Sequence, residues 1–306
     1  MASVRKKTAG KQEYYYLEHS FRERGKIQKK EKYLGKTLPD NLEELKRQII
    51  AETYRDKWLD LFDKIKKEYS EQEKITPPSA REKETENFII KFTYDTNRIE
   101  GSKLTFRETS LLLEKGITPN EKTLRDVKEA ESHRNAFYEM LSYEKELSLN
   151  TILYFHKKLF EETKKDIAGK LRQHQVAISG SRFMPSFPAE VYPLLMDFFR
   201  WYGRNKDRMH PVELAALVHL KLVTIHPFAD GNGRISRLIM NFVLHRHGFP
   251  MLNIPYEKRS GYYNALEKSQ IKKDETVFLQ WLFKRYLNEH RQYLKTSSNG
   301  KHNVLY

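Results

Sequence analysis

Apolar residues recur at helical spacing along most of this 306-residue chain. A spacing of three and four residues places them on one face of an α-helix, which can then be buried. Capping pairs such as Thr105 with Glu108, together with prolines and glycines, mark where these helices begin and end. We predict helices from about 40 to 75, 79 to 100, 105 to 116, 120 to 145, 149 to 163, 188 to 203, 211 to 225, 232 to 247, 260 to 270 and 275 to 293.

Two short stretches have strand-like patterns instead. Within residues 13–36, EYYYLEHSF and KIQKKEKYL are aromatic-rich or alternating runs separated by Arg22-Glu23-Arg24-Gly25, which is typical of a hairpin. At 175–186, QVAISGSRFMPS has β-branched residues on both sides of Ser179-Gly180-Ser181 and predicts a second hairpin. The predicted fold class is therefore mostly α, with a small N-terminal β element and one β-hairpin that projects from a helical body.

The positive charge is concentrated near the N-terminus. The formal net charge is +15, and residues 1–36 hold eleven Lys and Arg against four Glu, a local net charge of +7. Such a patch attracts phosphates or acidic surfaces, or serves only to keep the protein soluble. One interpretation is a nucleic-acid-binding regulator in which Tyr14, Tyr15 and Tyr16 stack on bases, although no DNA-binding motif is present. Protein docking or homo-oligomerisation through the same hairpin is another.

The composition excludes several classes of site. The chain contains no cysteine, so disulfides, thiolate nucleophiles and cysteine-ligated zinc are excluded. No apolar run approaches the ~20 residues that a membrane span needs. The N-terminal MASVRKKTAGKQEYYY lacks the apolar stretch of a signal peptide. We therefore expect a soluble, cytoplasmic protein without a membrane partner.

The stretch HPFADGNGRISR, residues 226–237, combines a candidate base, a carboxylate and an anion-binding turn. Pro227 forces the preceding apolar helix to end at about His226, and helical spacing resumes just after the glycines. The free N–H groups and the dipole of the new helix then form an anion site. Arg234 and Arg237 lie three residues apart in the first turn, so both can point towards one bound anion.

Other interpretations of this loop fit less well. A calcium loop with Gly233 at its sixth position would need ligands at Phe228 and Ile239, which cannot coordinate calcium. A dinucleotide-binding loop would need a third glycine and a preceding strand. A plain helix–turn–helix corner with a surface histidine is the structural alternative. His245 and His247 have no evident third metal ligand nearby, which favours surface histidines.

The loop resembles the signature of the Fic (filamentation induced by cAMP) family. HPFADGNGR matches HPFx[DE]GN[GK]R at every defined position, Arg237 supplies the second arginine, and a looser likeness extends over about 85–290. Fic proteins are helical enzymes that mostly transfer AMP from ATP to a hydroxyl side chain of a protein, with Mg²⁺. The resemblance implies a Fic-type helical bundle in which the 175–186 hairpin is a flap that pairs with the target segment.

The resemblance also implies roles for individual residues. His226 would be the base that deprotonates a target Ser, Thr or Tyr, and Asp230 would hold Mg²⁺ on the α- and β-phosphates. A neutral histidine suits this role, because its ordinary pKa of ~6.5 allows it to accept a proton at neutral pH. Tyr262 and Tyr263 would contact adenine or pack in the core. The implied nucleotide-binding residues are Gly231, Asn232, Gly233, Arg234 and Arg237.

Residues 96–101, TNRIEG, fit the inhibitory pattern [ST]xxxE[GN] of this family. Thr96 and Glu100 are four residues apart on a helix that ends at Gly101, so both lie on one face. A carboxylate delivered to Arg237 would take the partner that the γ-phosphate needs. In some relatives this glutamate helps a water molecule remove AMP, which leaves a de-AMPylating hydrolase as an alternative function.

We therefore predict an autoinhibited protein adenylyltransferase that uses ATP and Mg²⁺ and modifies a target protein and itself. The alternatives are the hydrolase that uses Glu100 and the nucleic-acid-binding regulator. The predicted domains are a basic hairpin-like element at 1–38, a helical region with the inhibitory helix at 39–119, the Fic core at 120–250 and C-terminal helices at 251–306.

Overall fold

A computed structural model of the chain describes residues 2–10, 12–23 and 26–295. The chain divides into two compact units, Met1–Asp63 and Lys64–Tyr306. The long helix α1 (Leu42–Ile75) contributes residues to both units. The four segments predicted from the sequence stay a prediction.

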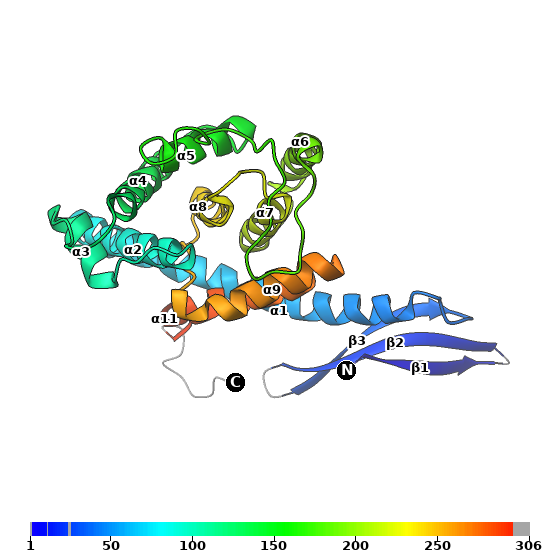
Figure 1. The fold of residues 1–306 in the computed structure, drawn as a ribbon. Helices are drawn as coiled ribbons and strands as arrows, with labels where there is room; N and C mark the ends of the chain where they lie inside the picture. Colours follow the sequence, from blue (N-terminus) through cyan, green and yellow to red (C-terminus); the bar gives the residue numbers. More distant parts are fainter. Residues whose placement is uncertain (1, 11, 24–25, 296–306) are drawn as a thin grey trace. The chain divides into compact units, whose positions relative to one another are not determined.

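The first unit contains a three-stranded antiparallel sheet in the order β1-β2-β3 (Figure 1). The predicted N-terminal β element is thus confirmed, but its first strand, ASVRKKTA, was not predicted from the sequence. The second and third strands pair down to Glu23 and Lys26, and the predicted turn residues Arg24 and Gly25 lie outside the described residues. The strands are β1 (Ala2–Ala9), β2 (Gln12–Glu23) and β3 (Lys26–Gly35).

The sheet carries an aromatic cluster between its strands. The rings of Tyr16 and Tyr33 have centroids 5.2 Å apart, and the ammonium of Lys7 lies 4.5 Å from the centre of the Tyr16 ring. Cross-strand aromatic and cation–π pairs of this kind stabilise small sheets. The stacking of nucleic-acid bases on this segment stays a prediction.

The second unit is helical, which confirms the mostly α fold class. In Figure 1, α7 and α8 lie inside a ring that α2, α4, α5, α6 and α9 form around them. Among the described residues, no helix has the length and apolarity that crossing a membrane requires. The helices after α1 are α2 (Pro78–Ile99), α3 (Phe106–Lys115), α4 (Leu124–Leu141), α5 (Leu149–Phe160), α6 (Pro188–Asn205), α7 (Pro211–Ile225), α8 (Asn232–Arg246), the 3₁₀ turn η1 (Tyr256–Lys258), α9 (Arg259–Lys272), α10 (Thr276–Glu289) and α11 (Arg291–Lys295).

Local capping explains several of these helix ends. The Thr105 side chain accepts from the Glu108 backbone N–H while the Glu108 carboxylate accepts from the Thr105 N–H, so the predicted capping box begins α3. Gly116 ends the same helix in the left-handed conformation, with φ of 68°. The chain then turns back into α4, which packs on α2 and α8.

The predicted hairpin at 175–186 is wrong as a pair of strands. The structure has a single turn there, in which the Ser181 N–H donates to the carbonyl of Ile178 (3.1 Å), and no strand ladder in the segment. Backbone carbonyls that a ladder would use accept instead from side chains, for example Ser186 from Arg172 and Pro185 from Gln175. Proline also has no N–H to donate to a ladder. The segment is an irregular loop, named here the 174–187 loop.

Candidate functional site

The corner between α7 and α8 is held by unusual backbone geometry. His226 caps α7 in the left-handed conformation, with φ of 54°, which is uncommon for a residue other than glycine. Asn232, the first residue of α8, accepts from the Phe228 N–H and donates to the Phe228 carbonyl, both at 2.8 Å. This two-way amide clamp fixes the loop between the two helices.

His226 bonds to the backbone through one of its two ring nitrogens. Its Nδ1 lies 3.2 Å from the Val223 carbonyl, which can only accept, so Nδ1 carries the proton and Nε2 has a free lone pair. Burial lowers the pKa of His226 below 6.5, against the effect of the Val223 carbonyl. The ring is therefore neutral near pH 7 and can accept a proton.

The first turn of α8 carries a bound carboxylate. A Cβ added to Gly233 would lie 2.2 Å from Oε1 of Glu100, so that carboxylate sits directly against the backbone at the start of the helix. Only glycine allows an anion to approach so closely. The free N–H groups and the dipole of α8 favour negative charge at this position. At the predicted anion site, the carboxylate of Glu100 therefore lies against the start of α8.

Arg237, one turn further along α8, binds the same carboxylate. It is 1% exposed and donates to Oε1 of Glu100 at 2.6 Å. It also donates to Oγ1 of Thr96 at 2.5 Å and to the Thr96 carbonyl at 3.2 Å. The three residues of the predicted inhibitory contact are therefore in one cluster. Gly101 follows directly with φ of 100°, just beyond the end of α2.

Arg234 points to a different acid. Its guanidinium donates to Glu129 at 2.5 Å and lies 3.5 Å from Asp230, whereas Arg237 binds Glu100. The expectation that both arginines point towards one anion is not met in this structure, because each arginine is buried and has its own carboxylate partner. Arg234 thereby ties α8 to α4.

Asp230 is ionised and surrounded by cations. Burial alone would raise its pKa, but Arg234 and Lys164 lower it to about 2. Its Oδ1 also accepts from the Gly231 N–H at 2.6 Å, and its Oδ2 is paired with Lys164. Its side chain is 37% exposed.

This carboxylate fits a shared metal site. Among the described residues, no three His, Asp or Glu side chains converge as the ligands of an all-protein site. Mg²⁺ often takes only one or two carboxylates and receives its other ligands from substrate phosphates and water. Asp230 is a hard oxygen donor of that kind beside the anion site.

A cavity of about 600 Å³ lies beside part of this corner, although Asp230, Asn232 and Arg234 are not among the residues that line it. His226, Gly233, Arg237 and Glu100 line one side, and the Ile178–Ser181 turn of the 174–187 loop lines another. A pocket of this size can hold a nucleotide.

The two tyrosines predicted to contact adenine or pack in the core both line the cavity, but they differ in burial. Tyr262 is 1% exposed, and its hydroxyl contacts Nε2 of His219 at 3.0 Å and Arg237 at 3.4 Å. It is therefore a core residue. Tyr263 is 45% exposed, and its hydroxyl donates to the Ile99 carbonyl at 3.1 Å, beside Glu100.

Several residues of the site escaped the sequence analysis. His156 stacks on Phe228 with ring centroids 3.8 Å apart, accepts from the Gly169 N–H at Nδ1 and donates from Nε2 to the Asp230 carbonyl at 3.0 Å. Lys164 pairs with Asp230, and Glu129 pairs with Arg234. These residues lie far from the loop in sequence, in no motif. Nothing in the sequence signals them.

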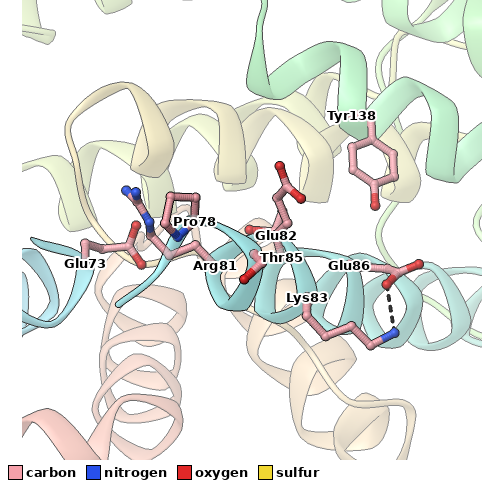
Figure 2. Close-up of a pocket in the computed structure, with 9 residues that line it drawn as sticks. Glu73, Pro78, Arg81, Glu82, Lys83, Thr85, Glu86 and Tyr138 are labelled. Carbon is pink, nitrogen blue, oxygen red and sulfur yellow. Dashed lines mark hydrogen bonds and ion pairs between the residues drawn. The ribbon is translucent and has the colours of Figure 1, made fainter. Parts of the chain in front are cut away.

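Another hollow, shown in Figure 2, is separate from this chemistry. It has a volume of about 770 Å³ and lies between the end of α1, the start of α2 and Tyr138 of α4. Its acidic and basic side chains include the Lys83–Glu86 ion pair at 2.8 Å. It contains no residue of the 226–237 stretch, so we place the functional site at the other cavity.

Comparison with known proteins finds a family match for part of the chain. Residues 146–244 match the Fic/DOC family. Protein adenylyltransferase fic-1 of Caenorhabditis briggsae is 32% identical over 220 residues, which make up 70% of this chain and 43% of that protein. Protein adenylyltransferase Fic of Drosophila ananassae is 36% identical over 181 residues, 57% of this chain and 35% of that protein. The chain spans less than half the length of these curated relatives.

Solved structures agree with the fold. Fic-1 of Caenorhabditis elegans superposes with a TM-score of 0.72 at 28% identity, over 85% of this chain and 80% of that one. A Fic domain-containing signalling protein of Bacteroides thetaiotaomicron gives a TM-score of 0.68 at 28% identity, over 78% of this chain and all of that one. This chain therefore contains a Fic/DOC domain at residues 146–244, in a fold similar to that of solved Fic proteins.

Proposed function

We propose that this protein transfers AMP from ATP to a Ser, Thr or Tyr hydroxyl of a target protein, and to itself. The observation that carries the proposal is that a neutral histidine and the anion site at the start of α8 line one cavity. A base beside an anion site is what attack of a hydroxyl on a phosphate ester requires. The names of the curated relatives support the same reaction.

In this mechanism His226 takes the proton and the loop binds the charge. Nε2 of His226 accepts the hydroxyl proton as the oxygen attacks the α-phosphorus. The bond from the α-phosphorus to the bridging oxygen breaks, and pyrophosphate leaves. The amides of Gly231 and Gly233, with Asn232, would bind phosphate oxygens through preorganised dipoles.

The two arginines and Asp230 complete the nucleotide site. Arg237, released from Glu100, would bind the γ-phosphate, and Arg234 would hold charge near the β-phosphate. Asp230 would hold Mg²⁺, and that ion would supply neutralising charge on the triphosphate. Its low pKa keeps the carboxylate available across the physiological pH range.

Glu100 would inhibit this reaction. Its carboxylate lies against Gly233 and binds Arg237 at 2.6 Å, in the region where a triphosphate would be bound. Two anions cannot share one arginine and one helix terminus without strong repulsion. ATP would therefore bind weakly, or with its α-phosphate out of line.

The test is intact-mass spectrometry of Glu100→Gly after incubation with ATP and Mg²⁺. We expect the variant to gain the mass of one or more AMP groups and the wild type to gain far less, because only the variant frees Arg237. The matched control is Glu100→Gly combined with His226→Ala, which keeps the open anion site and lacks the base. A variant that stays unmodified with every target offered would contradict the proposal.

The same material separates transfer from removal of AMP. Glu100 and His226 line the same cavity, so the carboxylate could also activate a water molecule. Wild-type protein is therefore added to target labelled by Glu100→Gly. Loss of AMP from the target would favour the hydrolase, and retention would favour a plain brake.

A further inference from the structure

Arg172 is a buried cation in the segment between α5 and α6. It is 3% exposed, and every contact of its guanidinium that involves a described residue is to a backbone carbonyl. Nε donates to the carbonyl of His226 at 2.8 Å, Nη1 to the carbonyl of His174 at 3.2 Å and Nη2 to the carbonyl of Ser186 at 2.6 Å. Its own N–H donates to the Pro227 carbonyl at 3.0 Å.

These four bonds join two loops that are far apart in sequence. Two of them hold consecutive carbonyls of the catalytic corner, those of His226 and Pro227. The other two hold the ends of the 174–187 loop, whose Ile178–Ser181 turn lines the cavity. A planar guanidinium with donors in a rigid fork can satisfy several carbonyls at fixed angles, which an ammonium cannot do.

Burial of this cation needs a reason. Taking a guanidinium out of water is costly, and charge-assisted bonds to carbonyls repay the cost only if all are made well. Burial accordingly lowers the pKa of Arg172 from its ordinary value. An apolar side chain would fill the same space without this cost.

We propose that Arg172 is a positioning residue that fixes the left-handed backbone of His226 and both ends of the 174–187 loop in one register. A target segment lying along the loop would then meet Nε2 of His226 at a set distance. The inference rests on the proposed function for its meaning, but its physical content does not depend on AMP transfer.

The strained backbone at His226 makes such support necessary. With φ of 54°, the residue lies in a region that is unfavourable for a residue with a Cβ, because the Cβ approaches the following carbonyl oxygen. Without the Nε donor on its carbonyl, this peptide can relax and turn the ring away from the cavity, because the backbone N–H of residue 172 holds only the next carbonyl. The charge of Arg172 also acts on the His226 ring. Burial and this charge lower the pKa of His226, while the Val223 carbonyl, Glu100 and Asp230 raise it.

The test uses Arg172→Gln and Arg172→Lys in the full chain, with two measurements. Hydrogen exchange followed by mass spectrometry reports peptides from 174–187 and from 226–228. Loss of a bond to a charged donor should speed exchange by about tenfold or more, in both regions together. NMR titration of ring-labelled histidine, with His226 assigned from His226→Gln, reports the pKa of the base.

The two variants separate the charge from the fork. Arg172→Gln removes both, so we expect faster exchange and a raised pKa of His226. Arg172→Lys keeps a charge without the fork, so exchange should speed up in both regions while the pKa rises less. A variant that merely unfolds would lose protection along the whole chain, which the exchange map shows directly.

The matched control is Arg134→Lys. Arg134 of α4 also donates to a backbone carbonyl, but this carbonyl belongs to Leu113 of α3 (2.6 Å), outside the two loops. It should leave both readouts at 174–187 and His226 unchanged. If exchange in the two loops and the titration are unchanged in both Arg172 variants, the inference is overturned. If they change while Glu100→Gly never acquires AMP, only the proposed function fails.

Discussion

Gly231 and Gly233 are two residues apart but serve different contacts. A Cβ at Gly231 would lie 2.3 Å from Cε2 of Phe160, so the loop packs directly on a fully buried ring of α5. A Cβ at Gly233 would meet the carboxylate of Glu100. The first glycine therefore belongs to packing and the second to the anion site.

Gly231→Ala should destabilise the protein more than Gly180→Ala does. Both Gly231 and Gly180 have positive φ, 79° and 75°, so alanine costs about 1–2 kcal/mol of strain at either. At Gly231 the clash with Phe160 adds about 1–3 kcal/mol of overpacking, whereas a Cβ at Gly180 meets nothing within 4 Å. Thermal unfolding measures both. Equal losses in the two variants would mean that the Phe160 contact relaxes freely.

The sequence pointed to the residues of the two motifs, but not to the residues that hold them in place. His226, Asn232 and Glu100 stand in motifs whose spacing carries their chemistry. Arg172 and His156 act on backbone atoms through single side chains, from segments more than fifty residues away. No local pattern marks such contacts, since the partner is a carbonyl that every residue has.

At the scale of elements, Arg237 couples α8 to α2 through an ion pair with Glu100 and hydrogen bonds to Thr96. Glu100 ends α2, and Arg237 is fully buried in α8 with Thr96 as its second partner. Removal of Glu100 leaves that arginine with neutral partners only, which is costly for a buried cation. An anion that replaced the carboxylate would restore the balance.

Glu100→Gly should therefore unfold at a lower temperature than the wild type and respond more to nucleotide. Loss of a hydrogen bond to a charged group costs about 1.5–3 kcal/mol, with the lower end expected because Thr96 still binds Arg237. A non-hydrolysable ATP analogue with Mg²⁺ should restore about 2.7 kcal/mol at a hundred times its Kd.

Two comparisons control this experiment, which is read by thermal unfolding. Glu86→Gln removes an exposed ion pair with Lys83 and should have almost no effect. The wild type should gain less from the analogue than Glu100→Gly does, because Glu100 competes for the site. An equal gain in both proteins would show that Glu100 does not occlude the nucleotide.

Helix boundaries followed from local chemistry, but the predicted hairpin did not form. The capping box of Thr105 and Glu108 and the terminal Gly116 are satisfied within a few residues. At 175–186 the flanking β-branched residues are also a local signal, yet side chains such as that of Arg172, which lies outside the segment, donate to its carbonyls. Strand formation depends on partners that the sequence pattern does not specify.

At the scale of the whole molecule, the helical unit encloses neutral histidines. His133, His156, His219 and His290 are each 6% exposed or less. Burial lowers the pKa of His156 to about 4 and that of the other three to about 3. In the unfolded chain each would titrate near ~6.5. The unfolded state therefore binds more protons than the folded state at mildly acidic pH.

The protein should lose stability steeply below neutral pH. A histidine whose folded pKa is lowered leaves stability unchanged above about pH 6.5 and reduces it as the pH falls from there towards the folded pKa, by about 1.4 kcal/mol per pH unit for each histidine. Urea unfolding between about pH 7 and about pH 5 should show this slope. In His133→Gln the amide can keep the bond that Nδ1 makes with Thr93. This substitution should reduce the slope by the contribution of one histidine, about 1.4 kcal/mol per pH unit. A slope unchanged by that substitution would mean that His133 is already hydrated and free to take up its proton in the folded state.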